Sequence, residues 1–185
     1  MEIIRSLTEL PELNGSVATI GSFDGIHRGH QALIKTCITE AKSRDLPSVI
    51  ITFHPHPQQL LRESDRQPIR LLSGIDERAY LIERYAPVDI LLVLDFNMGF
   101  AGMSAVEFTT EVLEKALNVK HVVVGYDHRF GHQREGNAEW LTHRGEKHGY
   151  GVSVIGPINN EDQPVSSTLI RDHIQYDRLD LANAM

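Results

Sequence analysis

The sequence has 185 residues, which is enough for one domain with a full hydrophobic core and short for two. Hydrophobic residues make up 41% and charged residues 23%, as in ordinary globular proteins. A net charge of −7 argues against a broad nucleic-acid-binding surface, so we expect no nucleic-acid partner. The longest apolar stretches, such as Ile90–Leu94, are far shorter than the ~20 residues that cross a bilayer, so we expect no membrane span.

The number of cysteines and the N-terminal sequence indicate the cellular compartment of the protein. The chain contains one cysteine, Cys37, which excludes an internal disulfide. The N-terminus lacks the basic start, apolar core and small-residue cleavage site of a signal peptide. Together these observations predict a cytoplasmic protein. Cys37 lies on the apolar face of a predicted helix, which indicates a core residue and not a nucleophile.

Hydrophobic periodicity predicts strands and helices that alternate along the chain. In chain order these are a strand at Val17–Ile20, a helix at Gly29–Lys42, a strand at Ser48–Phe53, a helix that ends at Tyr85, a strand at Asp89–Leu94, a helix that ends at Leu117, a strand at His121–Val124, a helix at Asn137–His148, a strand at Gly151–Ile155 and a short helix at Ser166–Ile174. Ser73 and Asp76 resemble a capping pair that starts the second helix. Ser104 and Glu107 form a capping box that starts the third.

Five apolar strands separated by helices predict a single α/β domain over residues 1–185, with a doubly wound parallel sheet covered on both faces. In such a sheet, ligands lie beyond the carboxyl ends of the strands. The segments that follow the five strands are rich in Gly, His, Asp and Pro: residues 21–30, 54–57, 95–102, 125–136 and 156–168. A purely structural protein would scatter such residues over both ends of the sheet. The sequence therefore predicts a functional site at this one edge.

The segment Gly21–His30 (GSFDGIHRGH) follows the first predicted strand and opens the first helix. Its glycines allow tight turns and the close approach of a ligand. A helix N-terminus offers free N–H groups and the positive end of the helix dipole, and His27 and His30 can donate hydrogen bonds to phosphate oxygens there. The segment predicts an anion site; the alternative is a glycine-rich turn with two solvent-exposed histidines.

A second group of donors lies at the start of the last predicted helix. Ser166, Ser167 and Thr168 supply hydroxyl and backbone N–H groups, and Arg171 follows one turn later. A guanidinium group at this position is suited to phosphate. The alternative is an ordinary helix cap followed by a surface arginine. The glycine–histidine segment in the same chain favours the phosphate interpretation.

Four segments together resemble one known family. Gly21–His30 is similar to the first motif of the HxGH nucleotidylyltransferases, and specifically to the N-terminal module of bifunctional riboflavin kinase/FMN adenylyltransferases. TFHPHP (Thr52–Pro57), VVVGYDHRFG (Val122–Gly131) and VSSTLIR (Val165–Arg171) resemble the family's next three motifs, in the same order. One departure is His128, where the family more often has Phe. Another is the family's C-terminal riboflavin kinase domain, which this sequence lacks, so we expect a fragment without kinase activity.

The resemblance implies a Rossmann-like nucleotidylyltransferase fold with five strands in the order 3-2-1-4-5. It implies an FMN adenylyltransferase (FAD synthetase) that joins the AMP part of ATP to FMN, giving FAD and pyrophosphate, with Mg²⁺ bridging the phosphates. The kinase domain would be a partner in cis in a longer chain. The implied site residues are His27, His30 and Arg171 for catalysis; Gly21, Phe23, Gly29, Gly125, Ser167 and Thr168 for ATP; and Asp127 and His56 near FMN and the metal, with Asp127 beside the Mg²⁺.

Several alternatives remain open. Another HxGH adenylyltransferase, of the pantetheine-phosphate or nicotinamide-mononucleotide type, shares the His-x-Gly-His motif, although the Phe-Asp-Gly before it favours the flavin enzyme. An inactive flavin-nucleotide-binding module would be expected to have lost a motif histidine or Arg171. Ten histidines raise a zinc protein as an alternative, but no spacing among them is diagnostic. Asp127 could be an ordinary exposed loop residue, and Asp24 is expected to hold the first loop through backbone hydrogen bonds.

Aromatic residues are the last group that the sequence leaves open. The flavin ring requires an apolar slot, and four phenylalanines lie on the predicted edge of the sheet: Phe53, Phe96, Phe100 and Phe130. The sequence does not choose among them. Trp140 and Leu141 are expected to face the sheet as part of a helix and not to form a flavin platform.

Overall fold

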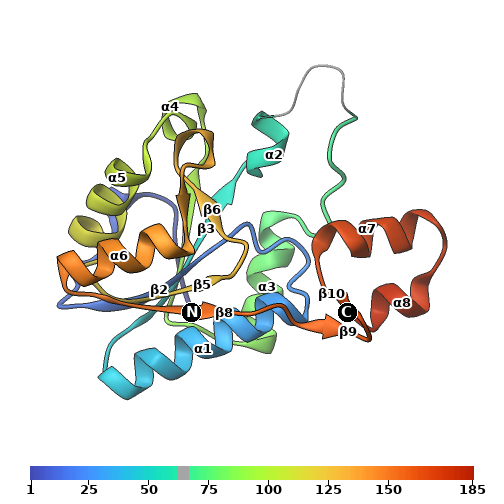
Figure 1. The fold of residues 1–185 in the computed structure, drawn as a ribbon, viewed down its shortest axis with the longest axis horizontal. Helices are drawn as coiled ribbons and strands as arrows, with labels where there is room; N and C mark the ends of the chain where they lie inside the picture. The colour runs from blue at the N-terminus through green and yellow to red at the C-terminus, as the bar shows by residue number, and fades with distance from the viewer. Residues whose placement is uncertain (62–66) are drawn as a thin grey trace.

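The computed structural model describes residues 1–61 and 67–185. Its centre is a six-stranded parallel sheet with the order β1-β4-β3-β2-β5-β8 (Figure 1). The strands are β1 (Glu2–Ile4), β2 (Ser16–Ile20), β3 (Ser48–His54), β4 (Ile90–Asp95), β5 (Val119–Gly125) and β8 (Gly151–Ile155). All five predicted strands are present, and their order confirms the implied 3-2-1-4-5 arrangement.

The predicted strand count of five is wrong, because β1 adds a sixth strand at the edge of the sheet. This strand has only three residues, which is too short for a period of two to be visible in the sequence. It pairs in parallel with β4, placing Glu2 opposite Ile90 and Ile4 opposite Leu92. Ile4 joins the hydrophobic core, so β1 also covers the edge that β4 would otherwise expose.

Helices connect the strands. They are α1 (Arg28–Arg44), α2 (Pro57–Leu60), α3 (Ile75–Tyr85), α4 (Met98–Ala101), α5 (Ala105–Phe108), α6 (Ala138–His148), α7 (Ser167–Gln175) and α8 (Leu179–Asn183), with a π-helical segment η2 (Thr109–Ala116) and short 3-10 turns η1 (Leu7–Glu9) and η3 (His132–Arg134). Two small antiparallel hairpins pair β6 (Arg129–Phe130) with β7 (Gly136–Asn137), and β9 (Asn159–Asn160) with β10 (Gln163–Pro164). In the described ranges, none of these helices has the length and apolar character to span a membrane.

One of the two predicted helix starts is confirmed and the other is wrong. The Ser104–Glu107 capping box is present, since the Glu107 N–H donates to Ser104 Oγ (3.1 Å) and the Ser104 N–H donates to Glu107 Oε2 (2.8 Å). The chain from there to Leu117 continues as the π-helical segment η2 and not as regular α-helix.

At the other start, Gly74 and not Ser73 is the N-cap of α3. The Gly74 N–H donates to Glu77 Oε2 (2.8 Å), so the reciprocal acidic residue lies one position beyond the predicted Asp76. Ser73 instead directs its N–H and hydroxyl toward the buried carboxylate of Asp24. A tertiary contact has therefore replaced the local cap that the sequence pattern predicted.

Helices cover both faces of the sheet, which confirms the doubly wound α/β fold (Figure 1). Strand residues alternate between the faces: Ile51 and Leu92 belong to the cluster that includes α5, η2 and α6, whereas Ile50 and Leu91 pack with α1 and α3. Cys37 of α1 is fully buried in a third cluster, and burial raises the pKa of its thiol to about 12. Its predicted place in the core is confirmed.

Candidate active site

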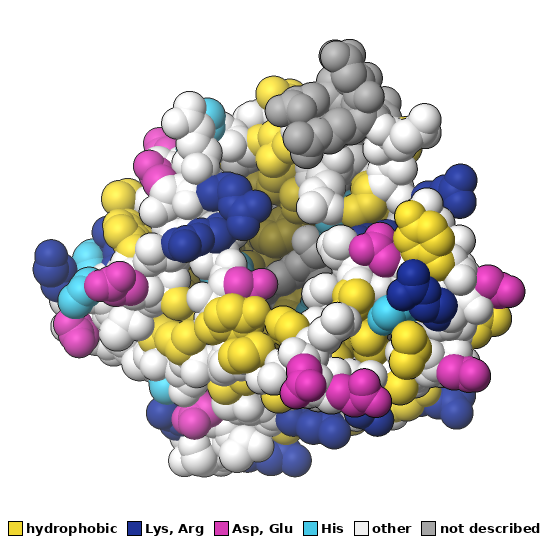
Figure 2. Space-filling view, turned by 45° about the vertical axis from the view of Figure 1, so that its right-hand side comes forward, with side chains coloured by type: hydrophobic (Ala, Val, Ile, Leu, Met, Phe, Trp, Pro, Cys, Tyr) yellow, Lys and Arg dark blue, Asp and Glu magenta, His cyan; other side chains and the backbone are white. Residues whose placement is uncertain are grey.

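A cleft of about 1900 Å³ opens at the carboxyl ends of the central strands. Figure 2 shows the molecule hollowed there, with apolar side chains in the hollow and basic side chains beside it. All eleven site residues implied by the sequence line this cleft: Gly21, Phe23, His27, Gly29, His30, His56, Gly125, Asp127, Ser167, Thr168 and Arg171. Segments up to about 150 residues apart in the sequence thus meet at one place, while the chemical roles of these residues stay predictions.

The loop between β2 and α1 has an unusual backbone. Phe23, Gly25 and Ile26 adopt φ angles of 50°, 84° and 43°, in the left-handed region. That region is rarely occupied by residues with a side chain and least of all by a β-branched one. The side chains of Phe23 and Ile26 are buried among α1, α3 and the sheet, which holds the loop in place. Such held strain is typical of functional loops.

His27 and His30 form a stacked pair at the start of α1, with ring centroids 3.6 Å apart. His27 is the N-cap residue, and its Nδ1 accepts a hydrogen bond from the His30 N–H (3.3 Å), so its proton resides on Nε2. Gly29 lies close to the pair, because a Cβ there would be 3.1 Å from the His27 ring, so a larger residue would have to displace that ring slightly. The predicted helix start is therefore present, with a histidine as its cap.

Both histidines are uncharged at neutral pH. Burial lowers the pKa of His27 to about 4, although Asp24 and Asp127 act in the opposite direction. Burial also lowers the pKa of His30 well below its usual value, with further contributions from His27 and Arg78. The pair can therefore donate hydrogen bonds to an anion but supplies no positive charge to it.

Asp24 and Arg171 form an ion pair at the floor of the cleft. Asp24 is 1% exposed and accepts hydrogen bonds from the backbone N–H groups of Leu72 (2.9 Å) and Ser73 (2.9 Å). The prediction that Asp24 holds the first loop through backbone hydrogen bonds is wrong, because the backbone N–H groups that its carboxylate binds belong to this later segment. The Arg171 Nε donates to the Arg70 carbonyl (2.7 Å), so the alternative of an unattached surface arginine is wrong.

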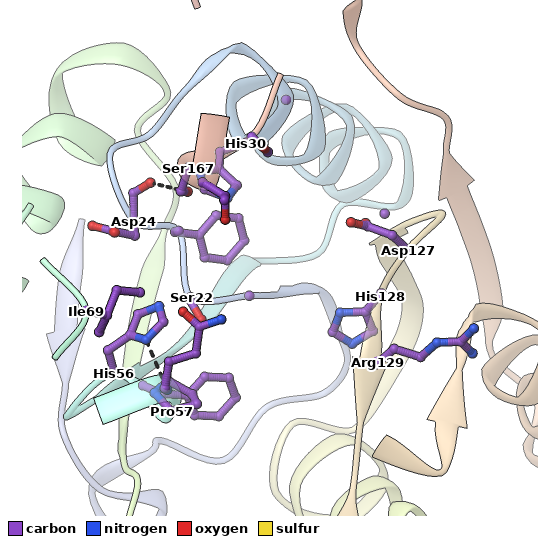
Figure 3. Close-up of a pocket in the computed structure, with 18 of the residues that line it drawn as sticks. Ser22, Asp24, His30, His56, Pro57, Ile69, Asp127, His128, Arg129 and Ser167 are labelled. Atoms are coloured by element: carbon purple, nitrogen blue, oxygen red, sulfur yellow. Dashed lines mark hydrogen bonds between the residues drawn. The ribbon is translucent and has the colours of Figure 1, made fainter. Parts of the chain in front are cut away.

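The start of α7 is joined directly to the glycine–histidine loop. Ser166 is the N-cap residue and accepts a hydrogen bond from the Leu169 N–H (3.2 Å), which is the ordinary helix cap of the alternative interpretation. The Ser167 hydroxyl donates to the Asp24 carbonyl (2.8 Å), a contact drawn in Figure 3. Thr168 is exposed and lines the cleft. The helix N-terminus and the loop thus form one continuous wall.

His56 and Asp127 lie on different sides of the cleft, just before α2 and just beyond β5 respectively (Figure 3). His56 caps α2 by accepting the Gln58 N–H at Nδ1 (3.2 Å), and burial lowers its pKa to about 4. Asp127 is exposed, and in residues 1–61 and 67–185 no group of three or more metal-binding side chains gathers. A single accessible carboxylate fits Mg²⁺, which is usually held by one or two carboxylates together with substrate phosphates.

Aromatic side chains form the other wall. The rings of Phe53, Phe96 and Phe100 lie 5.7 Å apart in pairs, and the series continues through Phe108 to Phe130. His128 lies on the same wall, stacked on Phe130 at 5.5 Å, and its Nε2 is buried without a hydrogen-bond partner in the described structure. All four predicted phenylalanines therefore line one surface. Trp140 packs on Phe130 and Leu141 is fully buried, so both belong to the core side of α6 as expected.

Two residues that contribute to the site, Phe108 and Arg78, were not predicted from the sequence. Phe108 lines the aromatic wall, but it comes from a helix and not from a segment that follows a strand. Arg78 of α3 lies buried behind the cleft and is 2% exposed. The sequence feature that could have revealed Arg78 is its position on the apolar face of an amphipathic helix, in line with Ile75 and Ile82.

Comparisons with known proteins agree with this geometry. The FAD synthetase family profile matches residues 9–169. The bifunctional riboflavin kinase/FMN adenylyltransferase of Escherichia coli (strain K12) is 36% identical over 182 residues, which are 98% of this chain and 57% of that protein. A crystal structure described as a macrolide-efflux protein from Streptococcus pneumoniae has a TM-score of 0.82 and 31% identity, over 94% of this chain and 56% of that chain.

A more distant structure shares the fold alone. Pantoate-beta-alanine ligase from Francisella tularensis has a TM-score of 0.58 and 13% identity, over 92% of this chain and 73% of that chain. The chain spans 57% of the length of the Escherichia coli relative. Because the family profile covers most of the chain, from the first turn to the helix that carries Arg171, the chain belongs to the FAD synthetase family.

Proposed function

We propose that the chain transfers AMP from ATP to FMN, giving FAD and pyrophosphate. The observation that carries the proposal is the cleft itself, where residues from four separate motifs of the family meet. The name of the Escherichia coli relative, which includes FMN adenylyltransferase, supports the same acceptor. That name also includes riboflavin kinase. The FAD synthetase profile over residues 9–169 supports the adenylyl transfer, which is the activity that we assign to these residues, with a kinase domain in cis as the partner in longer chains.

The reaction requires no covalent enzyme intermediate. An oxygen of the FMN phosphate attacks the α-phosphorus of ATP in line, forming a new P–O bond while the bond to the β-phosphate oxygen breaks. The FMN phosphate is already anionic at neutral pH, so no general base is needed. Catalysis then consists of positioning and of stabilising the charge on the transferred and leaving groups.

The two ends of the cleft suit the two substrates. His27, with its proton on Nε2, His30 and Arg171 lie with the exposed N-terminus of α7, where they would bind the ATP phosphates through neutral and charged donors. Gly21 and Gly125 would lie against the adenosine. The aromatic wall supports a flavin ring, which favours FMN over the pantetheine-phosphate and nicotinamide-mononucleotide acceptors.

Asp127 would hold Mg²⁺ at the edge of the cleft, together with phosphate oxygens of the substrates. When bound, the ion would neutralise phosphate charge. A single buried cysteine, Cys37, supports a reducing cytoplasmic setting for the reaction.

One assay tests the function. The purified chain is incubated with ATP, Mg²⁺ and one acceptor at a time: FMN, riboflavin, pantetheine phosphate or nicotinamide mononucleotide. We expect FAD and pyrophosphate with FMN, and no FMN from riboflavin. Adenylylation of another acceptor without FAD formation would refute the proposed acceptor. Flavin binding without any transfer would favour the inactive binding module, and FMN production from riboflavin would refute the absence of kinase activity.

A further inference from the structure

Arg78 is the largest side chain that the described structure buries completely. Its guanidinium lies behind the cleft, where one terminal nitrogen donates to Thr52 Oγ1 (3.1 Å) and to the Phe53 carbonyl (3.5 Å), and the other donates to the Ser73 carbonyl (3.4 Å). Within residues 1–61 and 67–185 its Nε has no partner. All of its acceptors are neutral, so hydrogen bonds hold the group in place without neutralising its charge.

No carboxylate of the described residues forms an ion pair with Arg78. The carboxylate that acts on it is Asp24, whose negative charge opposes the lowering of the Arg78 pKa by burial. The Asp24 carboxylate already forms an ion pair with Arg171 and accepts hydrogen bonds from the backbone N–H groups of Leu72 and Ser73. A buried charge without a partner is costly, so its presence beside a cleft requires a reason.

The charge balance at this end of the cleft supplies that reason. Burial keeps His27, His30 and His56 uncharged at neutral pH, and Arg78 contributes to lowering the pKa of both His30 and His56. Among the described residues, the charged groups beneath this part of the cleft are the guanidiniums of Arg78 and Arg171 and the carboxylate of Asp24, whereas the other charged groups of the lining are exposed: Arg70, Asp127, Arg129, Arg134 and Asp172. Arg171 and Asp24 neutralise each other, so the net positive charge of this set of three belongs to Arg78.

We propose that Arg78 is a positioning residue that provides the net positive potential for the phosphates of the bound nucleotide without touching them. The inference rests on the proposed function for the identity of the ligand. A charge beneath the protein surface is screened little by salt, unlike that of the exposed Arg129 and Arg134 at the rim. The positive charge of Arg78 would also offset the repulsion between an anionic ligand and the chain as a whole, whose net charge is −7.

The test measures binding of inorganic pyrophosphate to the full chain by calorimetry, without Mg²⁺, at low and high salt. Arg78→Met removes the charge and keeps an apolar side chain of similar length. At about 10 Å and an effective dielectric constant of about 20, a unit charge changes the affinity about tenfold for each negative charge of the ligand, so we expect the dissociation constant of the multiply charged pyrophosphate to rise at least about tenfold. Arg78→Lys keeps the charge and should stay within about threefold of wild type.

The double variant Arg78→Met with Asp24→Asn distinguishes the effect of net charge on pyrophosphate binding from the effect of lost structural contacts. It restores one net positive charge while removing further contacts, so we expect pyrophosphate binding to recover. A folded double variant that binds as weakly as Arg78→Met would overturn the proposal, as would unchanged binding in Arg78→Met. If Arg78→Met does not fold, Asp24→Asn alone carries the test: it should tighten binding, and unchanged or weaker binding overturns the proposal.

The FAD assay keeps this inference separate from the proposed function. Pyrophosphate binding that depends on Arg78, in a chain that makes no FAD, would refute the function and leave the inference standing. Normal FAD formation with pyrophosphate binding indifferent to Arg78 would refute the inference and leave the function standing.

Discussion

The two ends of the cleft are built in different ways. At the end proposed to bind the phosphates, hereafter the phosphate end, polar side chains are fixed by other protein groups: His27 by a backbone N–H, and Arg171 by Asp24 and a carbonyl oxygen. At the aromatic end, rings contact rings, and His128, which stacks on Phe130, leaves Nε2 unpaired in the described structure. One end therefore depends on precise geometry and the other on apolar surface. Substitutions should therefore cost most at the phosphate end.

The largest expected effect is at the histidine pair. We expect His27→Ala and His30→Ala each to lower kcat/KM by about 10²–10³, the scale for losing one donor to developing charge. His27→Asn tests the imidazole separately from the helix cap, since asparagine can still cap the helix but has no imidazole. Steady-state kinetics with ATP and FMN measure the effect, and exposed His143→Ala of α6 is the control. Near-normal activity of a folded variant would remove that histidine from the mechanism.

The same end should make the protein sensitive to acid. The pKa of His27 and of His56 is about 4 in the folded protein, against 6.5 for an unperturbed histidine. Between these values the unfolded chain binds more protons, so the free energy of unfolding falls as the pH drops from about 6.5 to 4 and is unaffected above that window. We expect a loss on the order of 2–3 kcal/mol for each histidine by pH 4, measured by denaturant unfolding.

A matched variant checks the origin of that loss. His56→Asn retains a capping side chain on α2 but cannot take up a proton. Its stability should fall less between pH 6.5 and 4 than that of the wild type. An equal fall in both proteins would mean that other groups cause the acid sensitivity.

A smaller effect is expected from Arg171→Lys. Lysine keeps the charge but cannot contact Asp24, the Arg70 carbonyl and a phosphate in the planar geometry of a guanidinium. We expect kcat to fall by about tenfold, more than the KM for ATP rises, because positioning suffers while attraction persists. Exposed Arg178→Lys is the control. Kinetics within about twofold of wild type would defeat the assignment, and a rise in KM at constant kcat would indicate ground-state binding only.

The smallest effect is expected at the aromatic end. His128→Phe keeps a ring on Phe130 and removes a buried nitrogen without a partner in the described structure, so the free energy of unfolding should rise by about 1 kcal/mol. FAD synthesis should stay within about threefold. A large rise in the KM for FMN would instead show that the imidazole binds the acceptor, and it would erase the contrast between the two ends.

The sequence predicted the positions of the strands better than the contacts between distant segments. Apolar runs such as Ser48–Phe53 marked strands, and the rule that parallel strands bind ligands at their carboxyl ends placed the site. The order of the strands came from the family resemblance, because periodicity says nothing about which strands are neighbours. Strand β1 was not predicted, because three residues are too few to show a periodic pattern.

Other features depend on tertiary structure and have no local signal. The Asp24–Arg171 ion pair joins residues 147 positions apart. Ser73 and Asp76 have the spacing of a capping pair, which predicted a helix cap at Ser73, but the Ser73 hydroxyl donates to Asp24 instead. Arg78 could have been noticed as a charged residue on an apolar helix face, yet only the fold reveals that this face lies against the cleft.

The contacts between Asp24 and α7 have a consequence for biosynthesis. Ser167 and Arg171 reach back over more than 140 residues to the first loop, and closing so long a loop is slow and entropically costly. During translation the first loop emerges early, whereas its partners emerge only after the whole sheet has been made. A nascent chain in which α7 has not yet emerged therefore carries the complete histidine motif without the contacts from Ser167 and Arg171 that complete the proposed anion site.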